Sequence, residues 1–135
     1  MEQYTYNEFE VASKTTVKQA ARQFAEAFVE TPQYLAFEKA YYAYSKDEKA
    51  QKALQEFQAK QASLQAMLML NAVSEADKVE LTRLRDNFYN QPSVLEYSKS
   101  QSELVAISQE IGDMITEAVG MDFGNACRTG GGCCG

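Results

Sequence analysis

The sequence has no histidine and no tryptophan, and only two prolines in 135 residues. Without histidine, one chain cannot form a nucleophilic site that pairs serine or cysteine with histidine, nor bind a metal through histidine. A general base working near neutral pH would need a strongly shifted carboxylate or lysine, and no motif indicates one. We therefore expect this protein not to be an enzyme.

Long apolar runs and an excess of basic charge are also missing. The most apolar stretch, residues 66–70, is far too short to span a bilayer. The opening residues Met1-Glu2-Gln3-Tyr4 lack the basic and apolar regions of a secretory signal. With 19 acidic and 13 basic residues, the formal net charge is −6, which disfavours direct binding to nucleic acid. We expect neither membranes nor nucleic acids to be direct partners.

Cysteine occurs three times, and all three residues lie near the C-terminus: Cys127, Cys133 and Cys134. An odd number of cysteines without a signal sequence indicates reduced thiols and predicts a cytoplasmic location. Glycine is concentrated in the same segment, so no regular structure is expected there unless a ligand holds it.

The apolar residues of the sequence recur with the period of a helix. No segment of useful length alternates apolar and polar residues, as a strand would. Helices are predicted at about residues 13–29, 32–44, 45–70, 75–89 and 92–119. Pro32 and Pro92 should begin helices, and Gly120 should end the last one. The predicted fold is an all-α helical bundle of about five helices, in which the two long helices form an antiparallel hairpin with three shorter ones. The chain divides into an N-terminal arm (1–12), a helical domain (13–120) and a Gly/Cys-rich C-terminal tail (121–135).

Polar residues suited to N-terminal capping precede several of these segments. Thr16 with Gln19 and Ser45 with Glu48 have the spacing of capping boxes, and Ser74 has the same role before residue 75. Asn71 should end the helix before it.

A short internal similarity relates residues 31–39 to residues 91–99, at a spacing of 60. In each segment a proline begins a helix, and apolar residues then recur with helical periodicity. Two interpretations are open: a common way of starting a helix, or a duplicated helix pair.

The apolar stripes exceed what a thin helical hairpin can bury by itself, which predicts a homodimer or larger assembly. Five residues are expected in the core or the interface: Leu54, Phe57, Leu64, Leu104 and Ile111.

Three other groups of side chains have a structural and a functional interpretation. The basic stripe is either a solvated face or a patch for an acidic partner or for RNA held by a complex: Lys46, Lys49, Lys52 and Lys60. The acidic stripe is interpreted as a solvated face, because a di-iron site of the Glu-x-x-His type needs histidine: Glu103, Glu110, Asp113 and Glu117. The aromatic set fits helix packing better than base stacking: Tyr34, Phe37, Tyr41, Tyr42, Tyr44, Phe57, Phe88, Tyr89 and Tyr97.

Two stretches resemble the YlbF/YmcA family of bacterial regulators. The first includes Val17-Lys18-Gln19-Ala20-Ala21 and Glu30-Thr31-Pro32-Gln33-Tyr34, followed by Asp47-Glu48-Lys49-Ala50-Gln51 and Phe57-Gln58. The second is Asn90-Gln91-Pro92-Ser93-Val94-Leu95-Glu96-Tyr97, followed by a long amphipathic helix. The resemblance covers residues 13–118.

The resemblance implies a small helical protein that self-associates. Some members carry C-terminal cysteines and join partner proteins in an iron–sulfur complex. That complex influences competence, sporulation and biofilm formation, and it assists ribonuclease Y in messenger RNA maturation. Other members lack the cysteines. The C-terminal cysteines of this chain place it nearer the first group, so its expected partners are further copies, other helical family members and a ribonuclease complex.

The cysteine tail is the candidate cofactor and metal site: Cys127, Cys133 and Cys134. Thiolates suit iron–sulfur clusters and zinc, and the fourth ligand would come from outside the chain. A thiol redox switch and an incidental tail are the alternatives. The predicted function is that of a non-enzymatic regulatory adaptor that binds an iron–sulfur cluster and modulates RNA processing or developmental regulation. The alternative is a structural helical oligomer or adaptor with an incidental or zinc-binding tail.

Overall fold

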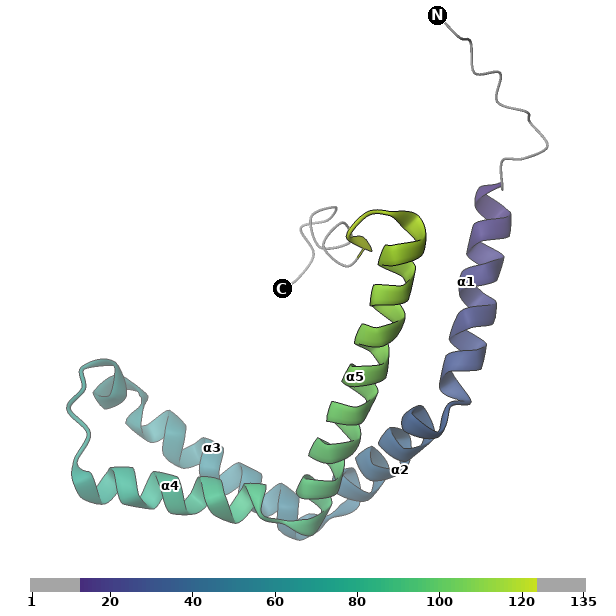
Figure 1. Cartoon of the computed structure of the whole chain (residues 1–135). Helices are drawn as coiled ribbons and strands as arrows, with labels where there is room; N and C mark the ends of the chain where they lie inside the picture. The colour runs from purple at the N-terminus through teal and green to yellow at the C-terminus, as the bar shows by residue number, and fades with distance from the viewer. Residues whose placement is uncertain (1–12, 124–135) are drawn as a thin grey trace, which may run out of the picture.

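The computed structural model describes residues 13–123, and their regular structure is helical throughout (Figure 1). Five helices follow one another: α1 (Lys14–Val29), α2 (Pro32–Lys46), α3 (Glu48–Met69), α4 (Glu75–Tyr89) and α5 (Pro92–Val119). The all-α prediction is confirmed, as are the helix starts at the two prolines.

Local hydrogen bonds fix the helix ends. Thr31 and Ser74 cap α2 and α4 by accepting from the N–H groups of Tyr34 and Asp77. At the end of α3, Asn71 adopts a left-handed φ of 51°, and the N–H of Ala72 donates to the carbonyl of Met67 at 2.9 Å. This is the Schellman arrangement, which satisfies carbonyls that the helix leaves unpaired. The predicted stops at Asn71 and Gly120 are therefore confirmed.

Two predicted caps are wrong. Thr16 lies inside α1, and its N–H donates to the Ser13 hydroxyl, which is the actual cap. Ser45 lies inside α2 and donates to the carbonyl of Tyr42 instead of capping α3. Asp47 caps α3 and accepts from the N–H groups of Lys49 and Ala50. Because its carboxylate is charged, it is a stronger acceptor than a serine hydroxyl.

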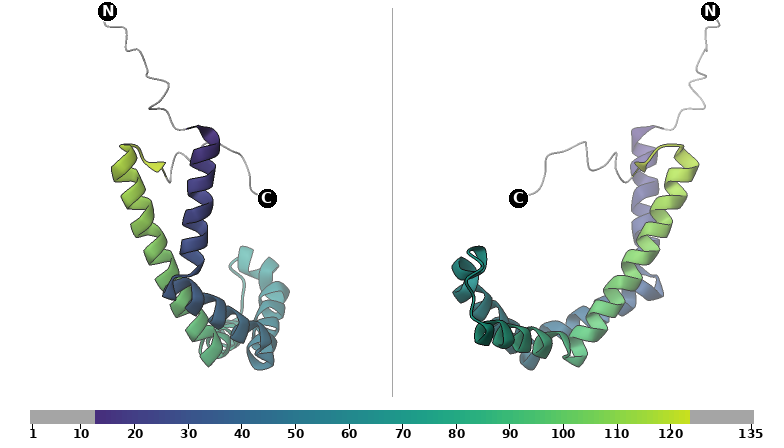
Figure 2. Two further views of the ribbon diagram at one scale, coloured as in Figure 1. Left: turned by 90° about the vertical axis from the view of Figure 1, so that its right-hand side faces the viewer. Right: turned by 60° about the vertical axis from the view of Figure 1, so that its left-hand side comes forward.

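The helices form a bent molecule with two arms (Figures 1 and 2). The closed arm is the packed pair α3 and α4. The elbow is α2 packed on the first half of α5. The open arm consists of α1 and residues 103–119 of α5, which extend from the elbow without forming an extensively packed pair.

The predicted antiparallel hairpin of the two long helices is not found in the described residues. The long helix α3 packs on α4, whereas the long helix α5 packs on α2. The short turn at residues 70–74 returns the chain directly onto α3, so α4 takes the position predicted for α5.

Aromatic rings build the elbow. Tyr97 of α5 lies 5.6 Å from Phe37 and stacks on Tyr44 at 5.2 Å between ring centroids. Tyr44 also meets Phe88 of α4 edge-on at 6.4 Å. Aromatic pairs of this geometry add stabilisation beyond the area they bury. Ring contacts at the elbow therefore join three helices, α2, α4 and α5.

The internal similarity coincides with the packing of the elbow. Phe37 and Tyr97 are equivalent at the spacing of 60, and their rings are in contact. Ala40 and Ser100 are also equivalent, and both are buried, at 5% and 2% exposed. Small residues at both positions let the backbones of α2 and α5 approach closely. The contact between Phe37 and Tyr97 agrees with a duplicated helix pair, and the proline starts of α2 and α5 agree with a common way of starting a helix.

Burial differs between the arms. Leu64, Val73 and Leu84 are buried in the closed arm, where Lys60 also reaches Asp77 at 2.7 Å. In the open arm no residue of α1 is buried, and the buried residues of α5, Val94 and Ser100, both belong to its first half. Of the five residues expected in a core or interface, Leu64 is buried, and the others are half-buried: Leu54, Phe57, Leu104 and Ile111.

Candidate functional site

The predicted cofactor site, Cys127, Cys133 and Cys134, lies outside the described residues. Within residues 13–123, no group of three or more acidic or cysteine side chains is arranged to hold a metal ion. None of the five helices is both long and apolar enough to cross a bilayer. The candidate sites in the described residues are therefore surfaces. The two arms differ most in how far their apolar side chains are buried.

The α1 half of the open arm presents an apolar stripe that is covered at its elbow end, where the half-buried Phe28 meets Tyr34 of α2, and exposed along the rest. Val17, Ala21, Phe24 and Phe28 recur at steps of four, three and four, which places them on one side of the helix. Phe24 is 48% exposed and Val17 is 59% exposed. Burying such side chains releases roughly 1.5–3 kcal/mol each, so this stripe favours contact with an apolar partner.

The α5 half of the open arm has the same character. Leu104, Ile107, Ile111, Met114 and Ala118 recur at steps of three, four, three and four on one face. Leu104, Ile107 and Ile111 are half-buried, and Met114 is 63% exposed. A shallow depression at the base of this half is lined by Gln33, Glu103, Ala106, Ile107 and Glu110. The surface is continuous and apolar, with carboxylates along its edge.

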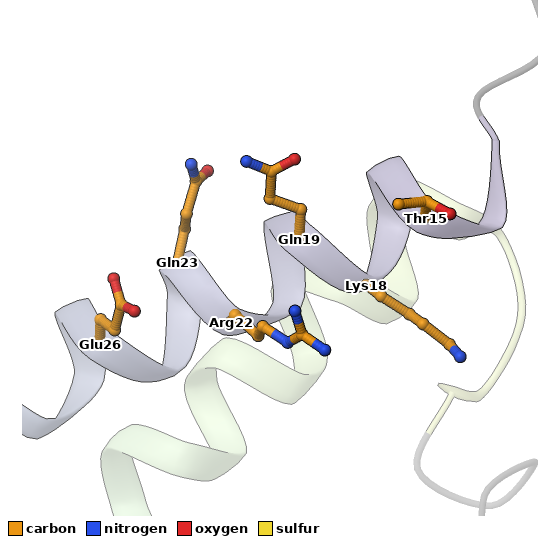
Figure 3. A pocket seen from close by; sticks show the side chains of 6 residues that line it. All are labelled: Thr15, Lys18, Gln19, Arg22, Gln23 and Glu26. Atoms are coloured by element: carbon orange, nitrogen blue, oxygen red, sulfur yellow. The ribbon is translucent and has the colours of Figure 1, made fainter.

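The other side of α1 is polar (Figure 3). A depression there is lined by Thr15, Lys18, Gln19, Arg22, Gln23 and Glu26, all from this one helix. Lys18 and Arg22 extend away from Gln19 and Gln23 (Figure 3). Because one helix supplies every lining side chain, this depression lacks the enclosing walls of a small-molecule site. Its two basic side chains, Lys18 and Arg22, form a basic edge on α1.

A charged hydrogen-bond cluster locks the junction between α3 and α5. The Asp47 carboxylate accepts from the Ser93 hydroxyl at 2.6 Å, in addition to capping α3. The hydrogen bond from Ser93, followed by that from the N–H of Ala50, lowers the pKa of Asp47 below its ordinary value. The Asp47 carboxylate is thus held ionised where the α2–α3 turn meets the start of α5.

Ion pairs occupy the outer face of the closed arm. Lys60 donates to Asp77, and this hydrogen bond, together with one from Ser74, lowers the pKa of the Asp77 carboxyl. On α4 itself, Arg83 makes two hydrogen bonds to Glu80 and lowers the pKa of that carboxyl. These groups are paired within the chain and fix the surface of the closed arm.

The structure divides the predicted basic stripe. Lys60 is paired with Asp77, and the Lys46 ammonium lies 5.8 Å from the centre of the Tyr42 ring. Lys49 and Lys52 border a depression together with Glu56, Asn87 and Gln91. An uninterrupted basic patch is therefore absent from this face of the described chain.

The structural interpretations of the acidic stripe and of the aromatic set both agree with the structure. All four residues of the acidic stripe are exposed: Glu103, Glu110, Asp113 and Glu117. Most of the aromatic set contacts other rings of the set, which supports the packing interpretation. The sequence interpretation did not single out the basic row of α1, Lys14, Lys18 and Arg22, although its steps of four would have indicated it.

The fold is that of a small all-helical protein with exposed apolar side chains on its open arm. Residues 17–120 match the family described as "Control of competence regulator ComK, YlbF/YmcA". The match covers most of the chain, so the protein belongs to the YlbF/YmcA family of competence regulators, and this supports a regulatory adaptor role. No curated protein is similar enough to match the chain.

Proposed function

We propose that this protein is a non-enzymatic adaptor subunit of a regulatory complex, and that its C-terminal cysteines bind an iron–sulfur cluster. The observation that carries the adaptor role is the open arm, whose apolar stripes are exposed in the single chain. An arm of this kind is suited to contact other proteins. The proposed partners are further copies of the chain, other helical family members and a ribonuclease complex. Through them it would modulate RNA processing or developmental regulation.

The cluster proposal rests on the chemistry of the donors. Cys127, Cys133 and Cys134 supply three of the four thiolates that a cluster commonly takes, so the fourth ligand would come from a partner or a small molecule. When bound, the cluster would supply a redox-sensitive and oxygen-sensitive centre. In the sequence, Cys127 follows Phe123, the last described residue, by four positions, and Cys133 and Cys134 follow within seven more.

Anaerobic purification followed by absorption spectroscopy and metal analysis tests the cluster. Broad visible absorption, together with iron and acid-labile sulfide, is the expected result. The matched control replaces all three cysteines by serine in the full chain and should be colourless while keeping its helical circular dichroism. Stoichiometric zinc in a colourless wild type would replace the cluster by a zinc site. If the wild type is metal-free, and its partner binding does not change when all three cysteines become serine, the structural oligomer is the better account.

The adaptor role is tested separately by partner binding. Purified wild-type protein is expected to bind purified family members or the ribonuclease complex, and a variant with Phe24→Asp in the open arm should bind more weakly. Leu95→Asp is the matched control, because Leu95 is similarly exposed, at 54%, but lies in the elbow. Equal binding by both variants would argue against the open arm as the adaptor surface.

A further inference from the structure

The two helices of the open arm carry charges of opposite sign beside their apolar stripes. The basic residues of α1 recur at steps of four: Lys14, Lys18 and Arg22. The acidic residues of α5 recur at steps of seven: Glu103, Glu110 and Glu117. All six side chains are exposed, and none forms an ion pair with another described residue. These charges are therefore available to a partner.

The side on which each row lies determines the direction in which the helices can pair. Residues advance about 100° per position, clockwise when a helix is viewed from its N-terminus. Lys14 and Lys18 lie clockwise of the stripe Val17-Ala21-Phe24-Phe28. The three glutamates lie anticlockwise of the stripe that begins at Leu104, each directly preceding a stripe residue.

In a parallel helix pair the clockwise edge of one helix meets the anticlockwise edge of the other, and these edge charges set partner choice and orientation. A parallel pairing of α1 with the distal half of α5 therefore brings the lysines opposite the glutamates. An antiparallel pairing places the basic row beside the uncharged edge that contains Ser108 and Gly112. The charge pattern favours the parallel pairing.

Within one chain, however, α1 and α5 run in opposite directions (Figures 1 and 2). We infer that the open arm is an interface between two copies of this chain, in which α1 of one copy packs in parallel on residues 103–119 of α5 of the other. A two-fold axis perpendicular to the arm reverses the second copy and produces this direction for both α1–α5 contacts. The result is a four-helix unit made from two open arms.

The dimensions agree with this assignment. Helix α1 has 16 residues, and the part of α5 beyond the elbow is of nearly equal length, so the two stripes match end to end. Packing α1 of each copy on α5 of the other covers both apolar stripes at once and places Lys14 and Lys18 beside the acidic row. The inference rests on the proposed self-association and does not depend on the cysteines.

Reciprocal charge reversal in the full chain tests the interface. One variant carries Lys14→Glu, Lys18→Glu and Arg22→Glu, and the other carries Glu103→Lys, Glu110→Lys and Glu117→Lys. Each variant alone places like charges across both contacts and should dimerise at least about tenfold more weakly than wild type. Mixed together, the two variants should recover dimers, because every contact in the mixed dimer again joins opposite charges. Light scattering gives the mass, and native mass spectrometry identifies the mixed species.

Matched controls place the same type of change away from the stripes. Glu26→Lys on α1 and Asp113→Lys on α5 lie outside the proposed contact and should leave dimerisation unchanged. The tests use the background in which all three cysteines are serine, so a missing cluster cannot alter the result.

Three outcomes would overturn the inference. A monomeric wild type would remove both the interface and self-association, leaving the cluster to be judged by its own experiment. Wild-type dimers that tolerate both reversals would keep self-association and reject this surface. Reversals that weaken the dimer but are not rescued by mixing would reject the contact between the two charge rows.

Discussion

The closed arm and the open arm are built from similar amphipathic helices, yet only one of them is complete in a single chain. In the closed arm, α3 and α4 are joined by the turn at residues 70–74, and each covers the apolar face of the other. In the open arm, α1 and the end of α5 come from opposite ends of the chain, and none of their residues is buried. Sequence proximity completes the closed arm, whereas the apolar side chains of α1 stay exposed in the single chain.

Removing a large side chain from each region gives the largest expected contrast. Phe88 is only 7% exposed and contacts Tyr44 and Tyr89, so Phe88→Ala should lower the free energy of unfolding by about 3–5 kcal/mol. Phe24→Ala in the open arm should change the monomer by less than about 0.5 kcal/mol and weaken dimerisation instead. Urea unfolding over a range of protein concentrations separates the two effects. Equal losses in the monomer would show that the open arm is packed within the chain.

Replacing an alanine by leucine, in the core or on the open arm, gives a second comparison of the two regions. Ala50 of α3 is fully buried beside Phe88 and Val94, so Ala50→Leu should overpack the core and cost about 1–3 kcal/mol. Ala21 lies on the exposed stripe of α1, and Ala21→Leu should leave the monomer unchanged while tightening the dimer. Thermal unfolding and light scattering measure the two consequences. A destabilised Ala21→Leu monomer would contradict an uncovered stripe.

A smaller effect is expected at the Asp47 lock. Because its pKa is lower in the folded chain than the ordinary value of about 3.9, the ionised carboxylate stabilises the fold above that value. This stabilisation is lost as the pH falls through the lowered, folded-state pKa. Asp47→Asn should therefore be less stable than wild type at neutral pH, and the difference should shrink in acid. A loss of stability in Asp47→Asn that is equal at neutral and at acidic pH would contradict this role of the Asp47 carboxylate.

Much of the fold follows from the sequence because local chemistry encodes it. Pro32, Pro92, Ser74 and Asn71 mark helix ends through backbone constraints and hydrogen bonds that involve only neighbouring residues. The cap of α3 was misplaced because Ser45 and Asp47 are both good capping residues. Asp47 differs from Ser45 in its charge and in the tertiary hydrogen bond that it accepts from Ser93.

Helix pairing was less predictable for a physical reason. Periodicity identifies the apolar face of α3 or α5 but not the helix that covers it, so two long helices were paired on length alone. The short turn after Asn71 was the better guide, because it returns α4 onto α3. The acidic row of α5 was visible in the sequence, but its meaning depends on the basic row of α1, which runs in the opposite direction within the chain.

Zero-length carbodiimide cross-linking of a mixture of unlabelled and ¹⁵N-labelled protein tests the arm exchange most directly. This reagent joins a lysine amine to a carboxylate only when the two are in contact, and the isotopes reveal whether they belong to different copies. The account predicts cross-links between copies that join Lys18 to Glu103 or Glu110, as parallel pairing requires. Cross-links confined to one copy, or links from Lys14 to Glu117 as in an antiparallel pair, would contradict it.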